Sequence, residues 1–194
     1  MTDEVLTMNE TPQVLQRLID LGRSLEPVTV AVCHPCSDVS LCGAVEAAQA
    51  QLIDPVLVGP AAKLQAVADH AGIDISSYRL IATAHSHESA ARAVALCRSG
   101  ECEALMKGSL HTDELMHEVT NPDTGLRTER RISHVFLMEV STYPKMLLIT
   151  DAAINIYPTL EDKSHIVQNA IDLAHVLGIP QPKVAILSAV ETVD

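Results

Sequence analysis

The chain has 194 residues, 47% of them hydrophobic and 20% charged, a composition typical of a globular protein with a core rather than of a disordered one. Its net charge of −12, with one Phe, three Tyr and no Trp, argues against a nucleic-acid partner, because phosphates would be repelled and few rings can stack on bases. We see no signal peptide, no apolar run near the roughly 18 residues that cross a bilayer, and no disulfide framework. We therefore expect no membrane association and a reducing, cytoplasmic setting.

Short apolar runs alternate with amphipathic helical patterns through the first part of the chain. Strands are predicted at residues 28–32, 55–58, 80–82 and 104–106, and helices at 12–24, from Ser37 or Asp38 onward, at 61–71, at 87–98 and from about 112. This alternation predicts a three-layer α/β fold, in which a mostly parallel sheet carries helices on both faces.

The pattern changes after residue 132. Residues 133–140 and 146–150 are two β-type runs joined by a short segment, which predicts an antiparallel hairpin. A helix is predicted from Thr159, with Asp162 three residues on, and a further strand at 184–187. We therefore divide the chain into a first α/β domain, 1–132, and a second, 133–194, that starts with the hairpin. The second domain looks incomplete, because a buried parallel strand normally leads into a covering helix.

The most informative passage is the turn between the strand at 104–106 and the next helix. A strand, a hinge at Gly108 and a helix N-terminus together make a place where backbone N–H groups face an anion. Lys107, Ser109 and Thr112 add a positive charge and two hydroxyls, so residues 107–112, here named the 107–112 loop, are a candidate phosphate site. The alternative is an ordinary turn with Thr112 as N-cap and Lys107 in solvent, and two carboxylates in the first helical turn favour it.

Two later stretches also carry side chains that could bind a substrate. Arg130 and Arg131, with Arg127, place three of the 13 basic residues within five positions, and guanidinium groups bind phosphate bidentately. The alternative is a solvated charged linker. Asp151 directly follows a predicted strand and can hydrogen-bond a substrate or orient a basic group, and the alternative there is an Asx turn.

The segment Cys33-His-Pro-Cys36 has the spacing of a metal or redox pair. A metal site needs a second pair of ligands, and a redox pair needs a thioredoxin-like setting; neither is evident in the sequence. We therefore expect no metal site here.

Several stretches match one enzyme family in the same order. They are 30–35 (VAVCHP), 57–60 (LVGP), 105–112 (LMKGSLHT), 130–138 (RRISHVFLM), 149–155 (ITDAAIN) and 184–193 (VAILSAVETV). Together they resemble the phosphate acetyltransferase/phosphate butyryltransferase family, from about residue 12 to the C-terminus. The 107–112 loop is similar to that of the butyryltransferase-like branch, which includes bifunctional enoyl-CoA hydratase/phosphate acetyltransferases, although no hydratase-like domain is visible.

The resemblance implies an isocitrate/isopropylmalate dehydrogenase-like fold and acyl transfer between CoA and inorganic phosphate in a cleft between two domains. CoA or acyl-CoA and phosphate or acyl phosphate would be the small-molecule partners, with no further cofactor and no metal. The substrate-binding residues that it implies are Lys107, Gly108, Ser109, His111, Thr112, Arg130, Arg131, Ser133, Asp151 and Asn155. The Ser-Arg and Asp residues usually credited with catalysis lie in a C-terminal segment that this sequence lacks. The catalytic residues are therefore unknown, and we expect little or no activity from these residues alone.

Two other hypotheses stay open beside an acyltransferase. One is a non-catalytic CoA- or phosphate-binding module that works with a partner chain. The other, a dehydrogenase-like enzyme, is disfavoured because no G-x-G-x-x-G follows a strand. An incomplete second domain would expose apolar surface, so we also expect a homo-oligomer.

Overall fold

The computed structural model describes residues 13–140, 142–143 and 145–187, so that residue 12 of the first predicted helix lies outside the described ranges. The chain divides into two compact units, with the division between Arg127 and Thr128, a few residues before the expected boundary. We call the parts before and after this division unit 1 and unit 2. No helix within the described ranges is both long enough and apolar enough to span a bilayer.

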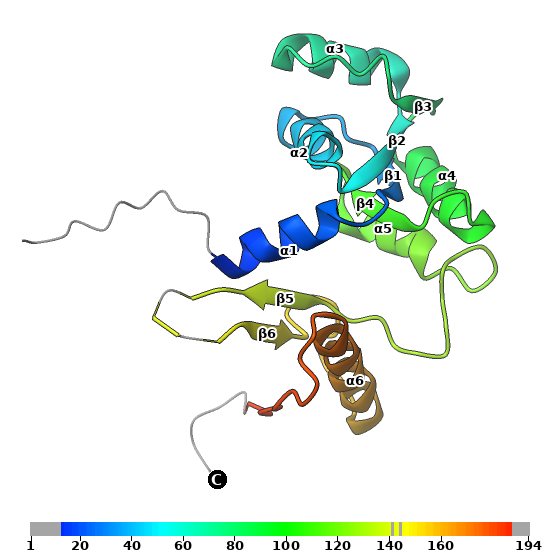
Figure 1. The fold of residues 1–194 in the computed structure, drawn as a ribbon. Helices are drawn as coiled ribbons and strands as arrows, with labels where there is room; N and C mark the ends of the chain where they lie inside the picture. Colours follow the sequence, from blue (N-terminus) through cyan, green and yellow to red (C-terminus); the bar gives the residue numbers. More distant parts are fainter. Residues whose placement is uncertain (1–12, 141, 144, 188–194) are drawn as a thin grey trace, which may run out of the picture. The chain divides into compact units, whose positions relative to one another are not determined.

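Unit 1 alternates helices and strands in the predicted order (Figure 1). Ser37 closes a capping box with Ser40 at the start of α2, and Gly72 and Gly100 end α3 and α4 with φ of 68° and 79°. The local signals therefore end the helices where the sequence predicts. The elements are α1 (Gln13–Arg23), β1 (Val28–Cys33), α2 (Asp38–Gln49), β2 (Ile53–Gly59), α3 (Ala61–Ala71), β3 (Arg79–Ala82), α4 (Ser86–Ser99), β4 (Ala104–Lys107) and α5 (Thr112–Val119).

The four strands of unit 1 form one parallel sheet in the order β3–β2–β1–β4. Val32 in β1 pairs with Leu57 of β2 on one side and with Met106 of β4 on the other. The two central strands are β1 and β2, and their apolar, β-branched residues suit burial on both faces.

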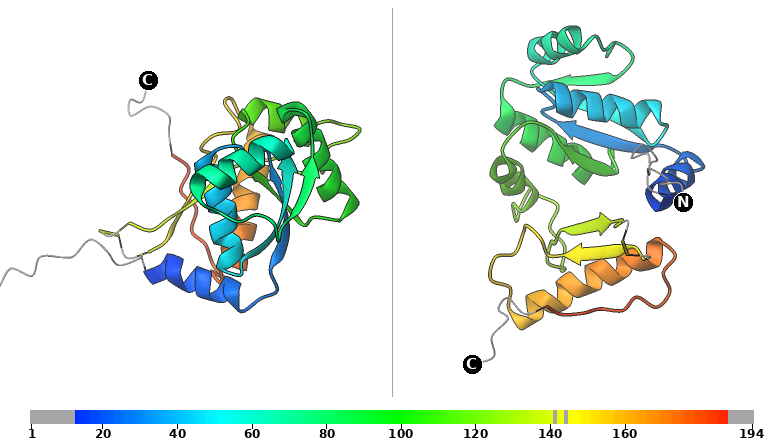
Figure 2. Two further views of the ribbon diagram at one scale, coloured as in Figure 1. Left: turned by 90° about the horizontal axis from the view of Figure 1, so that it is seen from above. Right: turned by 90° about the vertical axis from the view of Figure 1, so that its left-hand side faces the viewer.

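Side chains of the central strands alternate between two cores, because successive residues of a strand point to opposite faces. Val30, Val32 and Leu57 pack on one face with residues of α2 and α3, whereas Ala31 and Cys33 pack on the other with residues of α4 and α5. Figure 2 shows the helices of unit 1 on both sides of its sheet. The α/β class, the parallel sheet and its two helical layers are thus confirmed, while the closer likeness to isocitrate and isopropylmalate dehydrogenases stays a prediction.

Unit 2 contains β5 (Val135–Met138), β6 (Leu147–Thr150) and α6 (Leu160–Val176). The two strands pair antiparallel, with Phe136 opposite Ile149, and α6 packs against β6, so the predicted hairpin is confirmed. Thr159 and Asp162 form the predicted capping box at the start of α6.

The strand predicted at 184–187 is wrong: these residues form no strand in the structure. Their run of Val, Ala, Ile and Leu has β propensity, but an apolar run becomes a strand only when another strand satisfies its backbone groups. The sheet of unit 2 consists of β5 and β6 within the described residues, and Ile186 and Leu187 are 79% and 87% exposed. The rest of the matching stretch, 188–193, lies outside the described residues.

Candidate functional site

The 107–112 loop lies where the topology of the unit 1 sheet reverses. Strands β1 and β4 are neighbours, yet β1 leads into α2 on one face of the sheet and β4 leads into α5 on the other. In open α/β sheets, ligands bind in the crevice beyond the carboxyl ends of two such strands. The fold therefore places the loop at the position of unit 1 that is best suited to a ligand.

The loop is joined to the end of β1 by backbone and hydroxyl hydrogen bonds. The Gly108 N–H donates to the Cys33 carbonyl over 2.8 Å, and the Ser109 N–H donates to the His34 carbonyl over 3.0 Å. The Ser109 hydroxyl also donates to the His34 carbonyl and accepts from the Cys36 N–H, at 3.0 and 3.2 Å. In this structure the Ser109 hydroxyl is thus engaged in holding two turns together.

Gly108 is required by the closeness of this contact. A Cβ at this position would meet the backbone carbonyl oxygens of Cys33 and His34, the second at 2.5 Å. The Lys107 side chain is exposed, and its Nζ lies 3.3 Å from the Gly108 carbonyl. Gly108 therefore serves the close approach of the two turns, and Lys107 supplies the accessible charge of the loop.

The helix after the loop begins one residue earlier than a Thr112 N-cap would require. Thr112 is the first residue of α5 and His111 is its N-cap, without a side-chain hydrogen bond to the helix. Both side chains are exposed. The alternative in which Thr112 caps the helix is therefore wrong, and no side-chain cap closes the first turn of α5, whose N–H groups carry partial positive charge.

His34 anchors the turn after β1, and the sequence did not identify this role. It has a left-handed backbone with φ of 54° and is 7% exposed. Its Nδ1 lies 3.0 Å from the hydroxyl of the fully buried Ser89, which in turn lies 2.7 Å from the Thr83 hydroxyl. Burial, with help from Lys63, lowers the pKa of His34 against the opposing effect of Glu114, so His34 is neutral near pH 7.

The two cysteines that flank this turn are core residues. Cys33 is fully buried and Cys36 is 8% exposed. Burial raises the pKa of Cys33 to about 12, with smaller contributions from Cys36 and Glu114. Within the described residues, no group of three or more His, Cys, Asp and Glu side chains is arranged to hold a metal.

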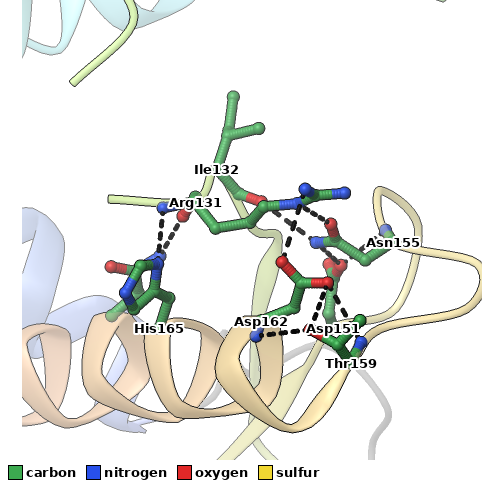
Figure 3. A network of polar contacts seen from close by, with 8 residues as sticks. Arg131, Ile132, Asp151, Asn155, Thr159, Asp162 and His165 are labelled. Carbon is green, nitrogen blue, oxygen red and sulfur yellow. Dashed lines mark hydrogen bonds and ion pairs between the residues drawn. The ribbon is translucent and has the colours of Figure 1, made fainter. Parts of the chain in front are cut away.

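In unit 2, Asp151 organises the segment after β6 (Figure 3). One of its oxygens accepts from the His134 N–H at 2.8 Å and from the Ile154 N–H at 3.4 Å. The other accepts from the Asn155 N–H at 2.7 Å and from the Asn155 amide. Burial would raise the pKa of Asp151, but these hydrogen bonds outweigh it and hold the pKa below its ordinary value.

Arg131 joins the same network through Asn155 (Figure 3). Its Nε donates to Asn155 Oδ1 over 2.8 Å, and its Nη1 lies 3.3 Å from a carboxylate oxygen of Asp162. Its backbone N–H donates to Nδ1 of His165 at 3.1 Å. Three of the predicted residues, Arg131, Asp151 and Asn155, are thus brought together; Asp162 and His165 were not predicted as part of this group.

Arg130 and Ser133 belong to a different place on α6. The Arg130 guanidinium pairs with Asp172 and lies 3.4 Å from Asn169, whose amide also donates to the Ser133 hydroxyl at 2.8 Å. The helix rises 1.5 Å per residue, so the carboxylates of residues 162 and 172 are about 15 Å apart along α6. The two adjacent arginines therefore point to different ends of the helix.

Unit 1 is thus an open α/β unit with a glycine-hinged loop at its topological switch point, and in unit 2 hydrogen bonds and an ion pair hold one arginine in place. The chain belongs to a transferase family: residues 81–194 match the family model described as "Phosphate acetyl/butaryl transferase".

Named relatives agree with this assignment. A phosphate acetyltransferase of Rhizobium meliloti is 56% identical over 182 residues, which are 94% of this chain and 58% of the relative. A phosphate butyryltransferase of Clostridium acetobutylicum is 34% identical over 74% of this chain and 48% of the relative. The chain thus spans about half the length of the relatives that it matches.

Solved structures share the fold. A phosphotransacetylase from Streptococcus pyogenes superposes with a TM-score of 0.71 at 16% identity, over 88% of this chain and 60% of that one. A branched-chain phosphotransacylase from Enterococcus faecalis V583 gives a TM-score of 0.64 at 24% identity, over 86% and 58% of the two chains.

Proposed function

We propose that the chain is part of a phosphate acyltransferase that catalyses acyl-CoA + phosphate = acyl phosphate + CoA. The observation that carries the proposal is the position of the 107–112 loop, at the switch point of the sheet, in a member of this family. Relatives named for acetyl and for butyryl transfer both match, so the proposal names a short acyl chain without choosing its length.

In unit 1, the proposed phosphate ligands are the charge of Lys107 and the N–H groups and hydroxyl at the start of α5, near His111 and Thr112. An anion there would be stabilised by the helix N-terminus. Gly108 and Ser109 would serve the site by keeping the loop against β1, as their hydrogen bonds support.

In unit 2, the proposed anion-binding group is Arg131 with Asp151 and Asn155. Arg131 is the arginine of this group because it alone of the adjacent pair contacts Asn155 in the described structure. For Arg130 and Ser133 the structure offers another role, the attachment of the residues before β5 to α6.

Measuring the binding of phosphate and of acetyl phosphate tests the proposed anion-binding groups of unit 1 and unit 2. In isothermal titration calorimetry, Lys107→Ala and Arg131→Ala should each weaken binding by about tenfold or more, because each removes a charged hydrogen-bond donor. Lys145→Ala, which removes an equal charge outside both groups, is the control. Unchanged affinity in both variants would refute the anion sites.

Measuring catalytic turnover distinguishes an acyltransferase from a non-catalytic CoA- or phosphate-binding module. These 194 residues span 58% of the Rhizobium meliloti relative, and we expect them to bind the anion with little or no formation of acyl phosphate from acyl-CoA. An acyl phosphate assay should show activity in the full-length gene product that contains this sequence. A full-length product that binds CoA and phosphate without turnover would favour the non-catalytic module that needs a partner chain.

We further propose a reducing, cytoplasmic setting and self-association. The five cysteines are free thiols, three of them buried, as suits a reducing setting.

Self-association is favoured by the surface of unit 2. This unit exposes large apolar side chains, among them Tyr157 at 94% and Leu160 at 86%, and such surface favours a homo-oligomer. Light scattering that shows a monomer at all concentrations would contradict the second proposal.

A further inference from the structure

The hydrogen-bonding groups of the Arg131 network can be counted one by one. Asp151 accepts four hydrogen bonds on two oxygens, which uses the capacity of a carboxylate. The Asn155 amide donates its two hydrogens to Asp151 and to the Ile132 carbonyl, the latter over 3.0 Å. Its oxygen accepts from Arg131 Nε.

This count leaves neither Asp151 nor Asn155 with a donor for an anion. The ionised oxygens of phosphate only accept hydrogen bonds, so an amide whose two hydrogens are already used cannot donate to them. A phosphate O–H would need a free acceptor, and the four hydrogen bonds to Asp151 leave none on its carboxylate. Arg131 has five N–H groups, of which its Nε and one on Nη1 have partners; Nη2 has none among the described residues. Its side chain is 53% exposed.

We propose that Asp151 and Asn155 are positioning residues that act through Arg131, and that Arg131 makes the anion contact of unit 2. Asp151 fixes both the backbone and the amide of Asn155, and Asn155 fixes the Nε edge of the guanidinium. Asp162, held by the Thr159 N–H at 3.0 Å, restrains a second edge of the guanidinium. The inference deepens the proposed function and rests on it, because it assigns separate roles within one anion site.

The physical reason for such an arrangement is the entropy of a long side chain. A free arginine must be ordered when it grips an anion, whereas one held at two edges is already in place. Figure 3 shows the guanidinium of Arg131 lying over Asn155 and Asp162 in this way.

A double-mutant cycle on the full chain tests the inference, with inorganic phosphate as the probe. Asn155→Ala should weaken phosphate binding between about two- and tenfold, the cost of ordering one long side chain. In an Arg131→Ala background, Asn155→Ala should have no further effect, because a residue that acts through another adds nothing once that other is gone. Asp172→Asn, which breaks the ion pair of Arg130 on the same helix, is the matched control and should leave phosphate affinity unchanged.

A spectroscopic signature distinguishes positioning from a general loss of structure. The Arg131 Nε–H resonance in NMR should be resolved and slow to exchange in the wild type and lost in Asn155→Ala, while the amide spectrum of α6 persists. Asp151→Asn should show the same loss; if this variant does not fold, Asn155→Ala alone decides.

Two results would overturn the inference while the proposed function stands. In the first, Asn155→Ala weakens phosphate binding equally in the wild type and in the Arg131→Ala background. In the second, Asn155→Ala weakens phosphate binding but leaves the Arg131 Nε–H resonance unchanged. Either would mean that Asn155 touches the anion itself. Phosphate binding that does not respond to Arg131→Ala would refute both the inference and the proposed site in unit 2.

Discussion

Replacing Gly108 by alanine should unfold unit 1 at much lower denaturant concentration than the wild type. A Cβ there would press into the carbonyl groups of Cys33 and His34. Backbone atoms of a central strand end cannot rotate away, so the loop would have to separate from β1. Overpacking costs about 1–3 kcal/mol, and the two backbone hydrogen bonds from the Gly108 and Ser109 N–H groups add about 1 kcal/mol each when lost. The total of about 3–5 kcal/mol is a large part of the stability of an ordinary domain, about 5–15 kcal/mol.

Urea unfolding followed by circular dichroism at a helix band measures this loss, since the chain has no Trp for fluorescence. Gly43→Ala is the matched control: Gly43 lies inside α2, and beyond the adjoining backbone of that helix nothing lies within 4 Å of an added Cβ, so alanine should stabilise the helix by up to about 1 kcal/mol. If the Gly108→Ala variant unfolds at the wild-type midpoint, the close contact between the two turns is not what holds the loop.

Three further predictions concern polar groups that are buried or half-buried. Hydrogen bonds hold the folded pKa of Asp151 below its unfolded value, so its contribution to stability is present above the unfolded pKa, about 3.9, and is lost as pH falls through the folded pKa. The stability of Asp151→Asn should therefore lack this loss when the variant is unfolded by acid. Removing the Ser89 hydroxyl in Ser89→Ala should cost about 1–3 kcal/mol in urea unfolding, because the buried His34 side chain loses its partner, and an unchanged midpoint would count against the cluster. Cys33, with a pKa raised to about 12 by burial, should resist a thiol reagent in the folded protein at pH 8 and react after unfolding, whereas the partly exposed Cys42 should react first.

Local sequence signals were sufficient for most helices and strands. The capping boxes at Ser37 and Thr159 and the glycines at the ends of α3 and α4 act within one or two turns of the chain, so their neighbours in sequence determine the outcome. Residues 184–187 show the limit of this reasoning. Their composition predicts a strand, but pairing with another strand decides whether one forms, and that is not a local property.

For the candidate site, the sequence by itself determined which chemical groups are present and that the 107–112 loop joins a strand to a helix. Only the tertiary structure decided which groups meet. His34 contacts Ser89 and Ser109 across 55 and 75 positions of the chain, and Arg131 reaches Asn155 across 24. The reason is that a hydrogen bond depends on the distance between two atoms in space, and spacing along the chain does not specify that distance until the sheet and helices have packed. The structure thus gives Ser109, Asp151 and Asn155 partners within the protein and leaves Lys107 and Arg131 with charge exposed to solvent.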